Sequence, residues 1–297
     1  MSASSFDAAA PFAARVRALP RLGLGVSTEF GARHDGLDLA LLRERAGGLV
    51  RFLEIGADLE RGIDLDALAW AERGWPVTYH FLDVNLEEAE DLDRAWIDET
   101  RALACSVHAS WLCGDAGLWH VGPRERGHGV LMPPVLEPEG AREMAANVRI
   151  LREASGLEVL PENPPAHVYL GRLHLLDYFA RVADEADAGL LLDVAHLAIY
   201  QAACGHAPLD GLDGFPLERV VEVHVAGSTR FDRDGRSFLD DDHGLAVLPD
   251  TWTIFAHVAE RATNLRAVVF ECERNAIDDV LPVFERLGET WSPGPGA

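Results

Sequence analysis

Acidic and histidine side chains recur along this chain just after short apolar runs, and their types and spacing suit metal-dependent chemistry. The densest groups are Asp193-Val-Ala-His196, Glu222-Val-His224, Asp241-Asp-His243 and Glu271-Cys-Glu273. Neutral imidazole and carboxylate groups together are ligands for Zn, Mn and Fe ions. The candidate metal ligands are His80, His108, Glu162, Asp193, His196, His224, Asp241, His243 and Glu273. These exceed what one ion uses, so the sequence predicts a site for two or three metal ions.

The elements that must position these residues are short runs rich in Val, Ile and Leu. Near-continuous apolar runs of this length are typical of strands buried on both faces, as in a parallel sheet. The runs are Leu22–Ser27, Val50–Gly56, Pro76–Leu82, Ala104–Ser110, Leu157–Asn163, Gly189–Val194, Val220–Gly227 and Ala267–Glu273. Between them lie amphipathic stretches with helical spacing, which include Gly140–Ser155, His174–Ala186, Thr251–Ala262 and Ile277–Leu287. This alternation of strand and helix predicts an α/β fold, a single-domain (β/α)₈ TIM barrel.

In such a barrel the side chains at the carboxyl ends of the strands converge on the barrel axis. The ligands expected at successive strand ends, from the third to the eighth, are His80, His108, Glu162, Asp193, His224 and Glu273. His196 follows Asp193 by three residues, so it reaches the same mouth from the first helical turn. Asp241 and His243 lie in the loop after the seventh strand, where alternate residues of an extended segment point to one side. Residues expected beside the ligands, as supports or substrate contacts, are His34, Glu54, Asp83, Asn163, Glu222 and Arg230.

Each candidate ligand also has a purely structural interpretation. A lone His at a strand end is more often hydrogen-bonded than metal-bound, and Asp193 alone is equally well explained as a helix N-cap. Buried carboxylates, however, are costly to desolvate unless they are paired or bound to a metal. Because acids or histidines follow six successive predicted strands, a metal site explains the pattern better than chance does.

Length and composition narrow the function further. The chain has 297 residues, with 26 basic and 49 acidic ones, and a net charge of −23. A surface this acidic repels phosphate backbones and anionic membranes. We therefore expect neither nucleic acid nor a membrane as a partner. The four cysteines form no C-x-x-C pair, and no apolar stretch is long enough to span a membrane, which favours a cytoplasmic protein.

The predicted barrel accounts for most of the chain. Residues 1–20 are expected to be an N-terminal extension, residues 21–288 the barrel, and residues 289–297 a flexible tail. Two long insertions, Cys113–Leu136 after the fourth predicted strand and Gly227–Val247 after the seventh, would shape the substrate pocket at the mouth.

Taken together, the motifs resemble the multinuclear non-heme iron-dependent oxidative enzymes, the family of MbnB and TglH. The motifs in this chain are Arg33-His34, Phe52-Leu53-Glu54, Ser106-x-His108, Leu131-x-Pro133, Glu162-Asn163-Pro164, Leu191-Leu192-Asp193-Val194, Glu222-Val-His224-Val-Ala-Gly227, Asp241-x-His243 and Glu273-Arg274. The resemblance spans about Leu22 to Leu287. It implies a TIM-type barrel that holds two or three iron ions and uses O₂ to modify a residue, often cysteine, of a ribosomally made precursor peptide. It also implies that a small partner protein often presents the leader of that peptide.

The same order of ligands resembles the wider xylose-isomerase-like barrel superfamily, whose endonuclease IV branch holds three zinc ions. A Zn- or Mn-dependent phosphoesterase or sugar isomerase/epimerase is therefore the alternative, although DNA binding would need clustered Lys and Arg. A non-catalytic protein that binds a partner through a solvated acidic face is the third hypothesis.

Overall fold

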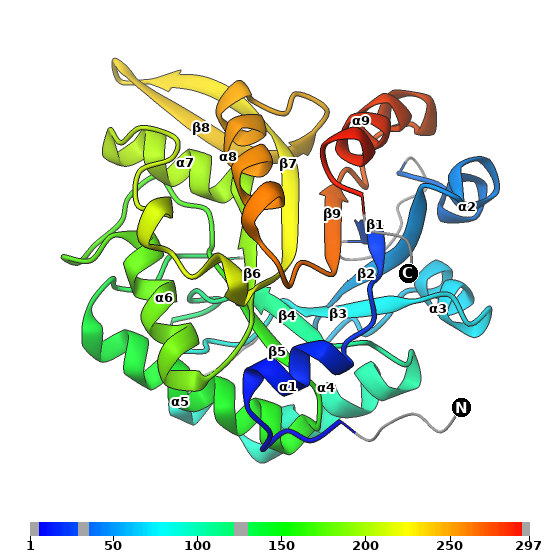
Figure 1. Ribbon diagram of the computed structural model, residues 1–297, viewed down its shortest axis with the longest axis horizontal. Helices are drawn as coiled ribbons and strands as arrows, with labels where there is room; N and C mark the ends of the chain where they lie inside the picture. The colour runs from blue at the N-terminus through cyan, green and yellow to red at the C-terminus, as the bar shows by residue number, and fades with distance from the viewer. Residues whose placement is uncertain (1–5, 29–35, 122–129, 293–297) are drawn as a thin grey trace.

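Eight parallel strands form a closed barrel in the computed structural model, which describes residues 6–28, 36–121 and 130–292 (Figure 1). The parallel strands are β1 (Gly23–Thr28), β2 (Val50–Ala57), β3 (Val77–Phe81), β4 (Leu112–Asp115), β5 (Val159–Glu162), β6 (Leu190–Asp193), β7 (Val220–Arg233) and β9 (Ala267–Glu271). Each pairs with its neighbour in this order, and β9 pairs with β1 to close the ring. The predicted single-domain TIM barrel is confirmed.

Helices surround the barrel and cover the outward faces of its strands (Figure 1). They are α2 (Leu39–Ala46), α3 (Leu65–Glu72), α4 (Arg94–Ser106), α5 (Pro138–Ser155), α6 (Leu175–Ala186), α7 (Val194–Cys204), α8 (Pro249–Arg261) and α9 (Ile277–Thr290). In the described ranges, three single-turn helices lie in the connections: η1 (Ala89–Asp91), η2 (Leu212–Gly214) and η3 (Leu217–Arg219). None of the described helices is long and apolar enough to cross a membrane.

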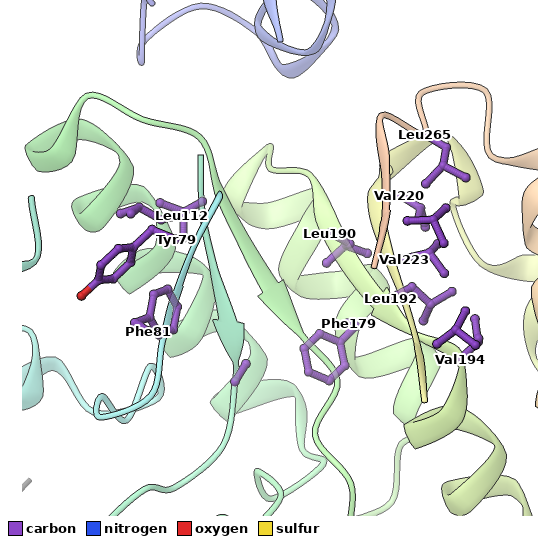
Figure 2. Packing of buried hydrophobic residues seen from close by; sticks show 14 of the residues in the cluster. Tyr79, Phe81, Leu112, Phe179, Leu190, Leu192, Val194, Val220, Val223 and Leu265 are labelled. Carbon is purple, nitrogen blue, oxygen red and sulfur yellow. The ribbon is translucent and has the colours of Figure 1, made fainter. Parts of the chain in front are cut away.

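The outer core lies between strands and helices, and Figure 2 shows part of it. Leu190 and Leu192 of β6 lie beside Val220 and Val223 of β7, on the side of the sheet that faces the helices. These β-branched and branched aliphatic residues favour extended backbone, and their burial on both faces of the sheet explains why the strands read as continuous apolar runs.

The inner core is sealed at the amino-terminal end of the barrel by α1 (Phe12–Ala18), which lies within the predicted N-terminal extension. Phe12 and Val16 of this helix pack in one cluster with inward-facing residues of six barrel strands: Phe52, Cys113, Leu160, Leu191, Val221, Ala267 and Val269. Gly25 of β1 makes room for the largest of these, because a Cβ at residue 25 would lie 2.4 Å from the Phe52 ring. The floor of the barrel is therefore a packed apolar core, as in other TIM barrels.

A buried ion pair fixes α1 in this place. Arg15 Nε lies 2.6 Å from Glu158 Oε2, and both side chains are almost completely buried. The guanidinium of Arg15 also donates to the carbonyl oxygens of Ala10 and Asp187. Because the charge of Arg15 is matched by a carboxylate and two carbonyls, the helix is held at one position on the barrel floor.

The predicted fourth strand was wrong. Residues 104–106 are the last turn of α4, and the fourth strand is Leu112–Asp115, further along the chain. The run from Ala104 has the apolar residues of a strand, but at helical spacing Thr100 and Ala104 face the core while Cys105 and Ser106 face solvent. The real strand is short and contains Cys113 and Gly114, so its strand propensity is low and the barrel, not its own sequence, holds it extended.

The second insertion, Gly227–Val247, was predicted as a loop but is largely a β-hairpin. Strand β7 continues beyond the barrel and pairs antiparallel with β8 (Arg236–Gly244), which projects at the top of Figure 1. Asp234 and Gly235 both have positive φ, 51° and 74°, as a two-residue type I′ turn requires. Asp241 and His243 thus lie on a strand that returns to the barrel mouth.

Candidate metal centre

The barrel interior changes from apolar to ionisable at the carboxyl ends of the strands. Because alternate residues of a strand share a face, an apolar residue of the floor is followed two positions later by an acid on four of the strands. The pairs are Phe52 and Glu54, Leu160 and Glu162, Leu191 and Asp193, and Val269 and Glu271. The ionisable cluster that results consists of Glu54, His80, Asp115, Glu162, Asp193, His196, His224, Asp241, His243, Glu271 and Glu273.

Glu162 lies at the centre of one half of the ionisable cluster. Its Oε2 is 2.8 Å from His80 Nε2, and its Oε1 is 3.3 Å from His224 Nδ1. His224 Nε2 is in turn 3.0 Å from Glu54 Oε1. The rings of His80 and His224 are stacked with their centroids 5.8 Å apart. Four strands, β2, β3, β5 and β7, thus place two imidazoles and two carboxylates within contact of one another.

The other half is built around His196 and His243. His196 Nε2 lies 3.1 Å from Asp241 Oδ2 and 3.6 Å from Asp193 Oδ2. His243 Nε2 lies 3.2 Å from the same oxygen of Asp241 and 3.7 Å from Glu271 Oε2. On its other side His243 Nδ1 is 3.1 Å from Glu273 Oε1. The hairpin strand β8 therefore completes the cluster from above.

Asp193 combines the two interpretations that its sequence position allows. Its Oδ1 caps α7 by accepting a hydrogen bond of 2.6 Å from the backbone N–H of His196. Its Oδ2 is buried, faces the cluster and has no hydrogen-bond partner in the described part of the chain. Asn163 fixes this carboxylate indirectly, because its side-chain amide bonds both the N–H and the carbonyl oxygen of Asp193 at 3.0 and 2.9 Å.

Several cluster atoms are buried without any hydrogen-bond partner among the described residues. They are Asp115 Oδ1, Glu162 Oε1, Asp193 Oδ2, His224 Nδ1, Asp241 Oδ1 and Glu271 Oε2. A buried polar atom without a partner costs about 1–3 kcal/mol, and natural proteins rarely leave several together. Within the cluster, groups of three such side chains place ligand atoms within 4.8 Å of one another. The donor set of imidazole and carboxylate therefore fits transition-metal ions, which would satisfy these atoms.

Protonation in the cluster follows from its density of charge. Burial opposes a charge on His80, but the hydrogen bond with Glu162 and the charge of Glu54 outweigh it and raise the pKa of His80 to about 9. Burial and the charge of Glu162 raise the pKa of the Asp115 carboxyl to about 8. Burial acts against ionisation of Glu162 as well, yet His224 holds the pKa of Glu162 well below its usual range. At neutral pH Asp115 therefore keeps a proton and the imidazole of His80 is charged. A bound cation would replace these protons, because ligands must lose their protons to bind a metal.

A cavity of about 180 Å³ lies over the ionisable cluster. Besides the ionisable groups, its lining includes Ser27 and Thr28 of β1 and the side chains of Trp119, Leu131 and Pro165. The cavity is small, so it admits a side chain or a small molecule to the ionisable groups but not a large folded surface.

Eight of the predicted ligands meet in the cluster: His80, Glu162, Asp193, His196, His224, Asp241, His243 and Glu273. His108 does not, because the run that was taken for the fourth strand ends in a loop at the opposite end of β4, where His108 is exposed with a φ of 54°. Asp115, which is not among the predicted ligands, ends the real β4 and lies 3.9 Å from His196 Nδ1. Glu271 is a further cluster residue outside the predicted set, and it reaches His243 as the predicted Glu273 does.

The expected supporting residues fall in different places. Glu54 is part of the ionisable cluster itself, and Asn163 supports Asp193. Glu222 lies deeper in the barrel, where its Oε2 accepts a hydrogen bond of 2.7 Å from Trp111 Nε1, and burial with the charge of Glu54 raises its pKa to about 8. Asp83 instead accepts from Leu59 N and Trp96 Nε1 outside the cluster. Arg230 is exposed on the hairpin, and His34 lies outside the described residues.

Comparisons with known proteins identify the family. Residues 29–288 match the family model described as RiPP precursor modification enzyme MbnB/TglH/ChrH. Among curated relatives, UPF0276 protein AM1_3026 of Acaryochloris marina is 26% identical over 209 residues, which are 67% of this chain and 71% of the relative. A UPF0276 protein of Rhizorhabdus wittichii is 27% identical over 225 residues, 75% of this chain and 77% of the relative.

Solved structures share the barrel. A xylose isomerase domain containing protein from Salmonella typhimurium superposes with a TM-score of 0.60 at 12% identity, over 91% of this chain and 97% of that one. A xylose isomerase domain protein from Planctomyces limnophilus superposes with a TM-score of 0.53 at 13% identity, over 92% and 97%. At such identities the likeness shows the fold, a xylose-isomerase-like TIM barrel.

Proposed function

This chain belongs to the MbnB/TglH/ChrH family of RiPP precursor modification enzymes, and on that premise we propose that it is a multinuclear iron enzyme that uses O₂ to modify a cysteine of a ribosomally made precursor peptide. The observation that supports the metal part best is the set of carboxylate and imidazole atoms at the barrel mouth that are buried without a hydrogen bond from any described residue. The family supports the peptide as substrate.

The residues that would hold two or three iron ions are those of the ionisable cluster. Glu54, His80 and His224 form one group of converging ligand atoms, and Glu162, Asp193 and His196 form another. Asp193, His224 and Glu271 form a third. Bound iron would supply one-electron redox chemistry and a binding position for O₂ and a thiolate.

The chain's own residues would prepare the site for this chemistry. Asn163 orients both Asp193 and His196, since the Asn163 carbonyl lies 2.9 Å from His196 Nδ1 and leaves Nε2 to face the cluster. Trp119 and Leu131 form an apolar wall beside the ionisable groups, which limits the access of water to the cavity. The small cavity would accept a cysteine side chain from an extended peptide.

Metal analysis and oxygen uptake of the same preparation test this proposal. We expect protein purified without oxygen to contain at least two iron ions per chain and to consume O₂ only when a cysteine-containing precursor peptide is added. A colourless protein rich in zinc or manganese and active without O₂ would contradict the proposal and favour the isomerase or phosphoesterase alternative. A serine peptide in place of the cysteine peptide is the matched control for uncoupled oxygen consumption.

We place this activity in the cytoplasm, where precursor peptides are made. A small partner protein that binds the leader of the peptide would raise the local concentration of the cysteine at the barrel mouth. Oxygen uptake measured with the leader removed from the peptide tests this part, since a chain that needs no leader should be unaffected.

A further inference from the structure

An apolar groove lies directly beside the cavity of the ionisable cluster. Its volume is about 650 Å³, within the usual range for small-ligand sites. The residues that define it here are Leu131, Met132, Val135, Val168, Leu170 and Ile199. Leu131, Pro165 and Asp241 line both the groove and the cluster cavity, so the two spaces are adjacent and share these three side chains as a common wall.

The groove presents its apolar side chains to solvent. Val168 is 66% exposed, Leu170 64% and Val135 47%. Ile199 at the floor is buried, so the groove has a packed base and an open rim. A gathering of exposed apolar side chains beside a catalytic cavity is typical of a binding surface rather than of scattered surface residues.

The walls of the groove are held in place without a ligand. Leu118 and Met132 exchange two backbone hydrogen bonds of 2.8 and 3.1 Å, and Leu136 N donates to Leu170 O at 2.8 Å. His167 Nε2 lies 2.9 Å from Leu239 O, which ties the loop after β5 to the hairpin strand β8. A preformed groove loses little conformational freedom when it is filled, so its apolar area contributes directly to binding.

We propose that this groove binds a bulky apolar side chain of the precursor peptide, from a residue within one or two positions of the cysteine. This inference rests on the proposed function, because it takes the cysteine to lie in the cluster cavity. An extended peptide advances about 3.3 Å per residue, so a residue within one or two positions of the cysteine reaches past the shared wall of Leu131, Pro165 and Asp241 into the groove. The carboxylates of Asp240 and Asp241 at the groove edge disfavour an acidic side chain there.

Short labelled peptides test the inference apart from any oxidation. The probes are fluorescein-labelled hexapeptides of Gly and Ser with one central cysteine. In one series the residue before the cysteine is Leu, Phe, Ser or Asp, and in a second series the residue after it is varied in the same way. Their dissociation constants are measured by fluorescence anisotropy with the metal-loaded protein under anaerobic conditions. Burying one such side chain predicts about 10- to 100-fold tighter binding of the Leu and Phe peptides than of the Ser peptide, on one side of the cysteine. Equal affinity of all four, or no saturable binding of the Leu and Phe peptides, would overturn the inference.

Rim variants locate the preference. Val168→Asp is expected to weaken the Leu peptide at least tenfold and to leave the Ser peptide unchanged. Leu65→Asp is the matched control, because Leu65 is 82% exposed on α3 and lies outside the groove. If the control weakens the Leu peptide as much as Val168→Asp does, the groove is not the binding site. If apolar peptides bind through Val168 but no O₂ is consumed, the groove assignment holds and the proposed iron chemistry fails.

Discussion

At the scale of single residues, the cluster depends on which strand end a side chain occupies rather than on its type. His108 and Asp115 lie seven residues apart, and only the second ends a barrel strand. Asp193 could be recognised from sequence as either a cap or a ligand, and it uses one carboxylate oxygen as a cap while the other faces the cluster. Because a carboxylate has two oxygens, one residue can be a helix cap and a metal ligand at the same time. Sequence patterns alone therefore could not decide between the two interpretations.

Removing Asp115 and His108 in turn tests this placement. We expect Asp115→Asn to lose at least one metal ion per chain, since the change removes a charged ligand atom with almost no change of shape. His108→Ala should retain the full metal content, because His108 is exposed and outside the cluster. Elemental analysis of protein purified without oxygen measures both. Loss of metal from His108→Ala, with Asp115→Asn intact, would contradict the structure of β4.

Asn163 tests how far support around the ligands matters. Its side-chain amide bonds both the N–H and the carbonyl oxygen of Asp193, so Asn163→Ala should weaken metal binding about 10- to 100-fold without removing a proposed ligand. The contact of the Asn163 backbone carbonyl with His196 Nδ1 is kept in this variant. A competition titration with a chromophoric chelator measures the change. As a control, Asn264→Ala removes an exposed amide that bonds Glu218 O, far from the cluster in the fold. Equal effects of the two substitutions would mean that Asn163 acts only through general stability.

At the scale of elements, sequence patterns placed seven of the eight barrel strands, and the misplaced one shows the limit of the method. The barrel strands that begin at Val50, Val220 and Ala267 contain runs of branched apolar residues, and such runs indicate a parallel sheet. Strand β4 has four residues, one of them glycine, so the neighbouring strands determine it. The hairpin could have been predicted from the sequence, because Asp234-Gly235 between extended segments is a strong signal for a type I′ turn.

The helix α1 offers a prediction about stability at this scale. Glu158→Gln would remove the nearest counter-charge of the buried Arg15 guanidinium and leave only the half-exposed Asp187 carboxylate at 3.7 Å. Removing one partner of a buried ion pair destabilises proteins by about 3–5 kcal/mol. The exposed pair Arg45–Asp278 is the control, and Asp278→Asn should cost less than about 1 kcal/mol. Urea unfolding followed by circular dichroism gives both values. A Glu158→Gln variant as stable as Asp278→Asn would show that α1 is not fixed through Arg15.

At the scale of the whole molecule, the net charge of −23 is partly concentrated inside the barrel. Seven carboxylates and four imidazoles form the ionisable cluster at the barrel mouth, and the rest of the cavity lining carries no charged side chain. The position of this site at the carboxyl ends of the strands follows from the fold alone, so it could be predicted from the sequence. The contacts within the cluster depend on the register of the strands and on the position of the hairpin. Knowing which residues end the strands does not determine these contacts.

The stability of the whole chain should therefore depend on bound metal. A ligand present at 100 times its dissociation constant stabilises the folded state by about 2.7 kcal/mol, and each kcal/mol shifts the melting temperature of a large domain by about 2–4 °C. We expect removal of metal by a chelator to lower the melting temperature by at least about 5 °C, and anaerobic addition of Fe²⁺ to restore it. The double variant Asp193→Asn, His224→Ala should show no such shift, because it lacks a ligand of each half of the cluster. Scanning calorimetry of the metal-free and reloaded protein decides the question, and an unchanged melting temperature would mean that the buried charges satisfy one another without a cation.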